Sequence, residues 1–84
     1  MKIARVEKPL VATNRIPGLE HRYLQVIVEK GGARSVAVDA VGCMPGDWVI
    51  VVGSSAAREA AGSKEYPSDA TIVGIIDYWE AEAD

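Results

Sequence analysis

Two adjacent serines, Ser54 and Ser55, are the residues of this chain whose type and position best suit nucleophilic chemistry. They follow Gly53 at the expected end of a strand, as a serine nucleophile does on a strand-to-helix turn. The Gly-x-Ser-x-Gly spacing is absent, however, and the single histidine, His21, lies far upstream without a convincing acidic partner. We therefore expect a serine hydroxyl to cap a helix, and His21 to be a loop residue. The sequence predicts that the protein is not an enzyme.

The remaining reactive side chains indicate structural roles. Cys43 is the only cysteine and lacks the Cys/His spacing of a zinc site, so we expect it to pack as a small apolar residue. Acidic residues flank the expected strand ends, where turn formation explains them more economically than paired acid-base catalysis. They are Asp39, Asp47, Asp69 and Asp77. No metal site and no cofactor are predicted.

Three large side chains are candidates for contacts between subunits. Arg58 stands among alanines in an expected helical turn and could pair with one of these aspartates, other than Asp47, across a subunit boundary. Tryptophan is enriched at the centres of protein interfaces. Of the two tryptophans, Trp79 is the better interface candidate, whereas Trp48 fits a core position equally well.

The elements that must position these residues are mainly strands. The chain is 49% hydrophobic, has no phenylalanine and draws its apolar content from valine, isoleucine, alanine and leucine. Branched side chains favour the pleated surface of a sheet. Strands are expected at residues 2–12, 22–30, 34–40, 47–53 and 71–79, and a short helix at 55–61. This order predicts an all-β fold, a small and partly open barrel, with a meandering antiparallel sandwich as the alternative.

The last two expected strands are apolar on both faces. A barrel interior takes only one face of each strand, and we expect the third strand to point Val36 and Val38 inward. In the last strand, Ile72 and Gly74 are expected on one face and Val73 on the other. The outer side chains would otherwise be exposed, although burying each one is worth about 1.5–3 kcal/mol. Because no second helix layer is available, we expect self-association, for which a closed ring is a natural outcome.

Size and charge narrow the class of protein further. With 84 residues, the chain has room for one domain, residues 1–84, in which about 80–84 form an acidic tail. A net charge of −3 argues against a non-specific nucleic-acid binder. One cysteine cannot form an intrachain disulfide, which favours a reducing, cytoplasmic setting. No stretch approaches the roughly 20 apolar residues that cross a bilayer, so no membrane partner is predicted.

Three blocks of the sequence together resemble the bacterial microcompartment vertex family, named for EutN and CcmL. The combination of VDxVG, GDWV, GSSAAR and PxDATIVGIID is more specific than any one piece. The blocks are MKIARVEKPLVATNRIPGL at 1–19, AVDAVGCMPGDWVIVVGSSAAR at 37–58 and PSDATIVGIID at 67–77. The run GSSAAREAAGSKEYPSD is most similar to the vertex proteins of α-carboxysomes, which package Rubisco and carbonic anhydrase.

The resemblance implies a five-stranded, OB-like barrel that assembles as a ring-shaped homopentamer. Such pentamers cap the icosahedral vertices of a shell that is otherwise tiled by hexamers, here the shell of the carboxysome of CO2 fixation. The role would be geometric, because hexagons alone tile a flat sheet and closure needs pentagons. The implied partners are other copies of the chain and hexameric shell proteins, with no nucleic acid.

The resemblance also assigns positions. The implied pore rim near the fivefold axis is Gly53, Ser54, Ser55 and Ala56. The expected subunit contacts are Arg58, Ile72, Val73, Ile75 and Trp79.

An OB-fold module that binds a small ligand or a nucleic acid is the alternative function. Such modules use stacking aromatic residues in a basic groove. This acidic chain has two tryptophans and three tyrosines. It therefore lacks the composition that a nucleic-acid binder needs.

Overall fold

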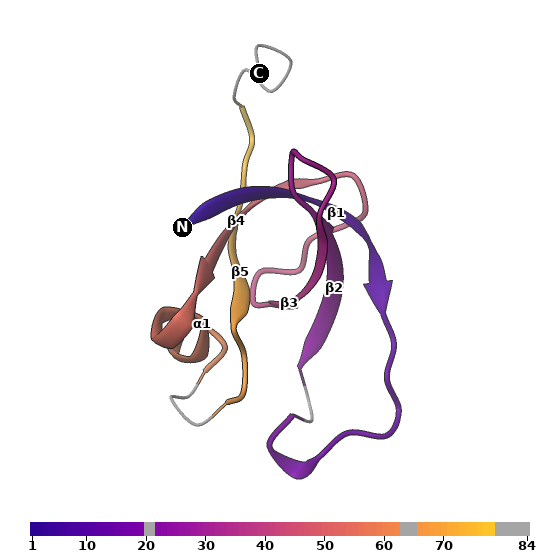
Figure 1. Ribbon diagram of the computed structural model, residues 1–84, viewed down its shortest axis with the longest axis vertical. Coiled ribbons are helices and arrows are strands. Elements are labelled where there is room, and N and C mark those ends of the chain that lie inside the picture. The colour runs from indigo at the N-terminus through magenta and orange to yellow at the C-terminus, as the bar shows by residue number, and fades with distance from the viewer. Residues whose placement is uncertain (20–21, 63–65, 79–84) are drawn as a thin grey trace.

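The strands of the computed structural model form one closed barrel. The structure describes residues 1–19, 22–62 and 66–78. Its elements are β1 (Lys2–Leu10), η1 (Pro17–Leu19), β2 (Tyr23–Val28), β3 (Arg34–Asp39), β4 (Trp48–Gly53), α1 (Ser54–Ala60) and β5 (Ala70–Ile75). The strands pair around the barrel in the order β1-β2-β3-β5-β4, and α1 lies beside one end of β4 and β5 (Figure 1). The predicted barrel is confirmed, although it is closed rather than partly open.

A glycine turn forms the β2–β3 hairpin. The β2–β3 hairpin closes where predicted, with the Glu29 amide donating to the Ala33 carbonyl at 2.9 Å. Gly32 there has φ 95°, a left-handed conformation that suits glycine. By contrast, β3 and β5 pair in parallel, at Val38 with Thr71. This parallel pair closes the barrel.

Small side chains fill the barrel interior. Opposed residues of neighbouring strands share a face, as Ala4 with Val49 and Val6 with Ile27 do. These four side chains have no exposed surface. The interior cluster is Ala4, Val6, Ile27, Ala37, Cys43, Val49, Val51, Ala70 and Ile72. Alanine and valine dominate because a five-stranded barrel leaves little internal volume.

A second apolar cluster lies on the outside of the barrel wall. It consists of Leu24, Val38, Ala61 and Tyr66, with Leu10 and Leu19 packed against it. The prediction that Val36 and Val38 point inward is wrong, because their neighbour Ala37 faces the interior. Val38 is buried under this outer cluster, whereas Val36 is 42% exposed. Part of the apolar outer wall is therefore covered by the chain itself, without a second subunit.

A bulge interrupts the alternation of β5. Val51 pairs with Ile72 and Ile50 pairs with Gly74, so Val73 is the extra residue. Val51 and Ile72 belong to the interior cluster, whereas Ile50 and Gly74 lie on the other face. The expectation that Ile72 and Gly74 share a face is therefore wrong, because an extra residue shifts the pairing by one.

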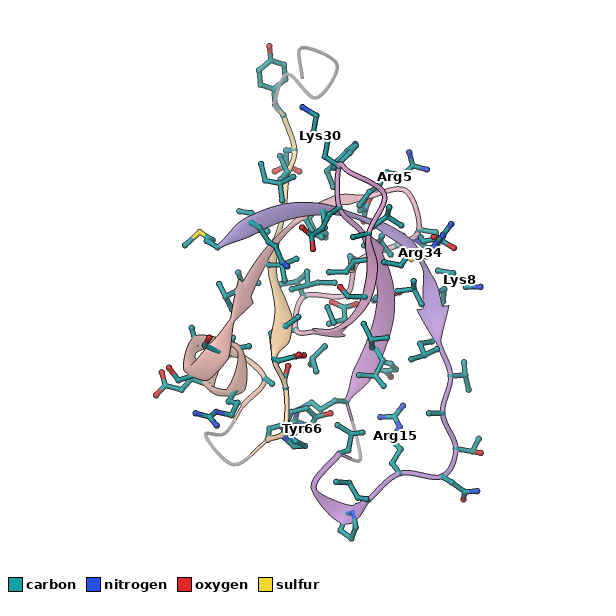
Figure 2. The ribbon with its side chains drawn as sticks, viewed as in Figure 1. Arg5, Lys8, Arg15, Lys30, Arg34 and Tyr66 are labelled. Atoms are coloured by element: carbon teal, nitrogen blue, oxygen red, sulfur yellow. The ribbon has the colours of Figure 1, made fainter. Side chains whose placement is uncertain are left out.

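Two arginines tie the long segment between β1 and β2 to the rest of the fold. Arg15 Nη1 donates to the carbonyl oxygens of Arg22 at 2.7 Å and Leu19 at 3.2 Å. Arg22 Nε in turn donates to the Ala61 carbonyl at 2.6 Å, and its guanidinium lies 5.5 Å from the ring centroid of Tyr66. Figure 2 shows Arg15 and Tyr66 near the end of the barrel opposite Lys30. These contacts hold the segment between β1 and β2, which includes Leu19, against the outer cluster.

Candidate subunit interface and pore rim

The predicted pore rim is an exposed turn where β4 passes into α1. Gly53, Ser54, Ser55 and Ala56 are all exposed. The helix begins one residue earlier than predicted, so its N-cap is Gly53 and no side chain caps it. The expectation that a serine hydroxyl caps the helix is therefore wrong. Ser54 has φ 52°, a left-handed conformation that is uncommon for residues other than glycine.

Buried contacts hold this turn in place. Thr71 Oγ1 donates to the Ala57 carbonyl at 2.6 Å, and neither residue has exposed surface. The backbone of Gly53 pairs with Ala70 on β5. A Cβ at Gly53 would approach the Asp69 carbonyl oxygen to 3.4 Å, so the two segments pass close together. The turn is therefore anchored to β5 by backbone and side-chain hydrogen bonds.

The side chains that the turn offers are the hydroxyl groups of Ser54 and Ser55. His21, the single histidine of the chain, lies outside the described residues. Within the described ranges, no group of three or more His, Cys, Asp or Glu residues is placed to hold a metal ion. In the same part of the chain, no helix has the length and apolar character to cross a membrane.

The aspartate nearest the core has a turn role, as predicted. Asp39 is 8% exposed and its carboxylate accepts hydrogen bonds from Gln25 Nε2 at 3.1 Å and from the amides of Val41, Gly42 and Cys43 at 2.8–3.0 Å. Burial acts to raise the pKa of Asp39, but these hydrogen bonds outweigh it and hold the pKa below its ordinary value. Asp39 therefore cannot pair with Arg58 of a neighbour.

The predicted contact residues fall into three groups. Val73 and Ile75 are 36% and 40% exposed on β5, and Arg58 is exposed on the last turn of α1. Ile72 differs, because its side chain is fully buried inside its own barrel and cannot reach a neighbour. Trp79 lies outside the described residues.

One apolar residue beside β5 was not predicted. Ile3 is 41% exposed and pairs with Ile50, which pairs with Gly74. The side chain of Ile50 occupies the space beside Gly74, since Cδ1 would lie 3.5 Å from a Cβ there. Ile3 and Ile50 thus lie beside Gly74 on the outer face, next to the bulged Val73, whereas Ile75 pairs with the interior residue Val49 and is exposed at the end of β5. We call Ile3, Ile50, Val73 and Ile75, the exposed or half-buried apolar residues on or beside this part of β5, the β5 patch. The alternation of Ile3 with buried Ala4 was the available signal in the sequence.

Comparison with known proteins reveals one family. The family model described as ethanolamine utilisation protein EutN/carboxysome matches residues 1–77. A carboxysome shell vertex protein, CsoS4A of Prochlorococcus marinus subsp. pastoris, is 70% identical over 83 residues, which cover 99% of this chain and 93% of the relative.

Solved structures agree with this relationship. CsoS4B of Halothiobacillus neapolitanus has a TM-score of 0.87 at 45% identity, covering 93% of this chain and 100% of the other. GrpN, a pentameric microcompartment shell protein from Rhodospirillum rubrum, has a TM-score of 0.84 at 31% identity, covering 96% and 99%. The chain belongs to the EutN/carboxysome family.

Proposed function

We propose that this chain is a structural shell protein whose homopentamers cap the icosahedral vertices of a carboxysome. The observation that carries the proposal is the 70% identity to a carboxysome shell vertex protein over nearly the whole of both chains. Identity to CsoS4B, at 45%, is much lower, which favours the CsoS4A type of vertex protein and with it the α-carboxysome. The chain acts through its shape and its contacts rather than by catalysis.

The closed barrel makes each subunit a rigid building block. A closed barrel with a tightly filled interior has no free sheet edge and resists deformation. Head-to-tail contacts between such units form a closed ring when the rotation between neighbours returns to its start. Five copies in a ring make a pentagon, which introduces the curvature that flat hexagonal tiling lacks.

The β5 patch is our proposed contact with the next subunit. Its exposed side chains leave apolar surface in water, and covering such surface contributes about 25 cal/mol per Å². Arg58 is exposed on helix α1, and Asp69 and Asp77 are exposed too, so we propose that Arg58 pairs with one of these aspartates of another copy. Ile72 is not part of this contact, because its side chain is buried inside its own barrel.

The exposed turn Gly53–Ala56 is our proposed pore rim. The turn joins β4 to α1 at the Ala70 end of β5, and we place it toward the ring axis. Five copies of Ser54 and Ser55 would then surround a narrow polar opening. The outer edges of the ring would meet hexameric shell proteins.

Native mass spectrometry of the purified protein tests the assembly. We expect an oligomer of five times the 9.0 kDa chain mass. A stable monomer would overturn the proposal. A second test is fluorescent tagging in cells that build carboxysomes, where we expect discrete foci on the shells and open or elongated shells after deletion of the gene. Intact closed shells without any vertex protein of this type would contradict the vertex role.

A further inference from the structure

A hollow of about 560 Å³ lies at one end of the barrel. It sits where β1 ends at Leu10, β2 begins at Tyr23 and β3 ends at Asp39, and all three residues line it. Small-molecule sites often lie in the mouths of β-barrels and have volumes of roughly 300–1,000 Å³. The hollow therefore has the position and the size of a ligand site, and we call it the end hollow.

Apolar side chains form most of the wall of the end hollow. Val11, Tyr23 and Met44 line it as exposed residues, while Leu10 is half-buried and Leu24 is buried. Apolar surface that is left in water in this way is covered favourably by an apolar molecule. The wall therefore suits a ligand whose body is largely apolar.

The end hollow also has an unused hydrogen-bond acceptor. Gln25 lines the hollow and is only 6% exposed. Its Nε2 donates to the Asp39 carboxylate and to the Cys43 carbonyl, which fixes the orientation of the amide. Oε1 of the same amide is buried and has no hydrogen-bond partner in the described part of the chain. Because nearly all buried polar atoms in proteins are hydrogen-bonded, this oxygen suits a donor on a bound molecule.

An arginine borders the same hollow. Arg15 belongs to the segment between β1 and β2, and Figure 2 shows its side chain reaching back toward the barrel. Its guanidinium donates to the carbonyls of Ala12, Leu19 and Arg22, which are neutral and leave its charge in place. A planar cation packs well against an aromatic ring, and so does the thioether of Met44. The wall therefore favours an aromatic ligand over an aliphatic one.

We propose that the end hollow binds a small aromatic molecule that carries an N–H or O–H donor. The donor bonds to Gln25 Oε1, and the ring lies against Leu10, Met44 and the guanidinium of Arg15. Indole is the simplest probe of this class, because it has a flat apolar body, one N–H donor and no carbonyl or hydroxyl group. Neither β1 nor β2 pairs with β5, so the end hollow and the β5 patch are separate surfaces. The inference does not depend on the vertex role.

Two matched probes test the hydrogen bond in the unmodified protein. Indole and 1-methylindole share one ring system, but the second has a methyl group in place of the donor proton. Titrations followed through the methyl resonances of Leu10, Leu24 and Met44 give both dissociation constants. We expect indole to bind about five-fold more tightly, the effect of one hydrogen bond. A purely apolar hollow would bind the more apolar 1-methylindole at least as tightly, and that result would overturn the proposal.

Matched variants of exposed residues locate the site. Met44→Ala removes a side chain that lines the hollow and should weaken indole binding several-fold. Ile16→Ala is the control, because Ile16 is 64% exposed against 66% for Met44 but does not line the hollow. It should bind indole as the parent does. Equal weakening in both variants, or none in Met44→Ala, would place indole elsewhere and overturn the proposal.

Gln25→Met tests the acceptor itself. The change keeps the length of the side chain but removes the amide, so the preference for indole over 1-methylindole should disappear. Because the hydrogen bond to Asp39 is lost as well, circular dichroism must show that the barrel is still folded. A folded Gln25→Met protein with the full preference would overturn the proposal. If this variant does not fold, the probe pair and Met44→Ala decide the question, since both keep the amide in place.

The titrations use the native oligomer, so they also show whether a neighbouring subunit covers the end hollow. We expect one indole per chain and the same native mass with and without indole. Methyl resonances of Leu10, Leu24 and Met44 that do not shift up to the solubility limit of indole would overturn the proposal. A monomeric protein that binds indole would instead contradict the vertex role and support this site.

Discussion

The side-chain amide of Gln25 donates a 3.1 Å hydrogen bond to the carboxylate of Asp39, where both residues are more than nine-tenths buried. The same Gln25 nitrogen lies 3.3 Å from the Cys43 carbonyl. Because Asp39 also accepts from the amides after β3, one buried carboxylate organises the turn that leads toward β4. The stability of this turn should therefore depend on the charge of Asp39.

We predict that Asp39→Asn lowers the free energy of unfolding at pH 7 by about 1–3 kcal/mol, the cost of leaving buried donors poorly satisfied. The pKa of Asp39 is lower in the folded protein than its ordinary value of 3.8. The stabilisation from its ionised form is thus complete above about pH 5 and is lost as the pH falls below the ordinary value and through the folded pKa. Urea denaturation at fixed protein concentration should show the difference between variant and parent shrinking toward acid pH.

The control for this prediction is Asp69→Asn, since Asp69 is exposed. Its effect on the free energy of unfolding should stay within about 0.5 kcal/mol. A penalty for Asp39→Asn that stayed constant down to the most acid pH measured would contradict an ionised role for Asp39.

The thiol of Cys43 should be inert in the folded protein. Cys43 is 5% exposed, and burial, together with the nearby carboxylate of Asp39, raises the pKa of its thiol to about 12. Since the thiolate is the reactive form, we expect a thiol reagent at pH 8 to modify the native protein only at the rate of unfolding. Addition of urea should expose one thiol per chain. Rapid modification without denaturant would show that the turn opens locally.

Gly62 should tolerate no side chain. It has φ 119°, and a Cβ there would lie 2.7 Å from Nη2 of Arg22, the residue that ties the chain to Ala61. We predict that Gly62→Ala destabilises the protein by about 1–3 kcal/mol, the usual cost of a strained backbone. Gly31→Ala is the matched control, because nothing lies within 4 Å of its Cβ position. Thermal unfolding compares the two, and equal midpoints would contradict the strain argument.

Much of the barrel could be predicted from local patterns. Runs rich in valine and isoleucine between glycine turns identified every strand to within a few residues, and Gly31 and Gly32 identified the β2–β3 hairpin. These features depend on neighbours in the sequence. The doubly apolar pattern of β5 did not show which face is inside, and Ile72, which was expected at the subunit contact, lies in the interior instead.

The side of the wall that each residue faces could not be predicted in the same way. Tyr66 and Ala61 are distant in sequence from Val38, yet they bury it on the outside of the barrel. The bulge at Val73 reverses the alternation of β5 without any glycine or proline at that position. The predicted serine N-cap is wrong because the helix begins one residue earlier than expected, which makes Gly53 the N-cap.

The β5 patch offers the sharpest test of the proposed ring. Val73→Glu and Ile75→Glu each place a carboxylate where we expect a neighbouring subunit to cover apolar surface. An uncompensated charge in a buried contact costs about 3–5 kcal/mol, and the ring repeats this cost at every contact. We predict loss of the pentamer in native mass spectrometry, while the monomer keeps the circular dichroism spectrum of the barrel.

Val36→Glu is the matched control, because Val36 is a strand valine that is 42% exposed, close to the 36% of Val73. It lies on β3, outside the β5 patch, so the same change in charge and size should leave the pentamer intact.

Loss of the pentamer in all three variants would indicate a general effect of the added charge rather than a specific contact. Retention in Val73→Glu and Ile75→Glu, with loss in Val36→Glu, would move the interface to the β2–β3 side of the barrel. Only loss confined to the first two variants supports β5 as the contact, because the three positions are exposed to nearly the same extent before assembly.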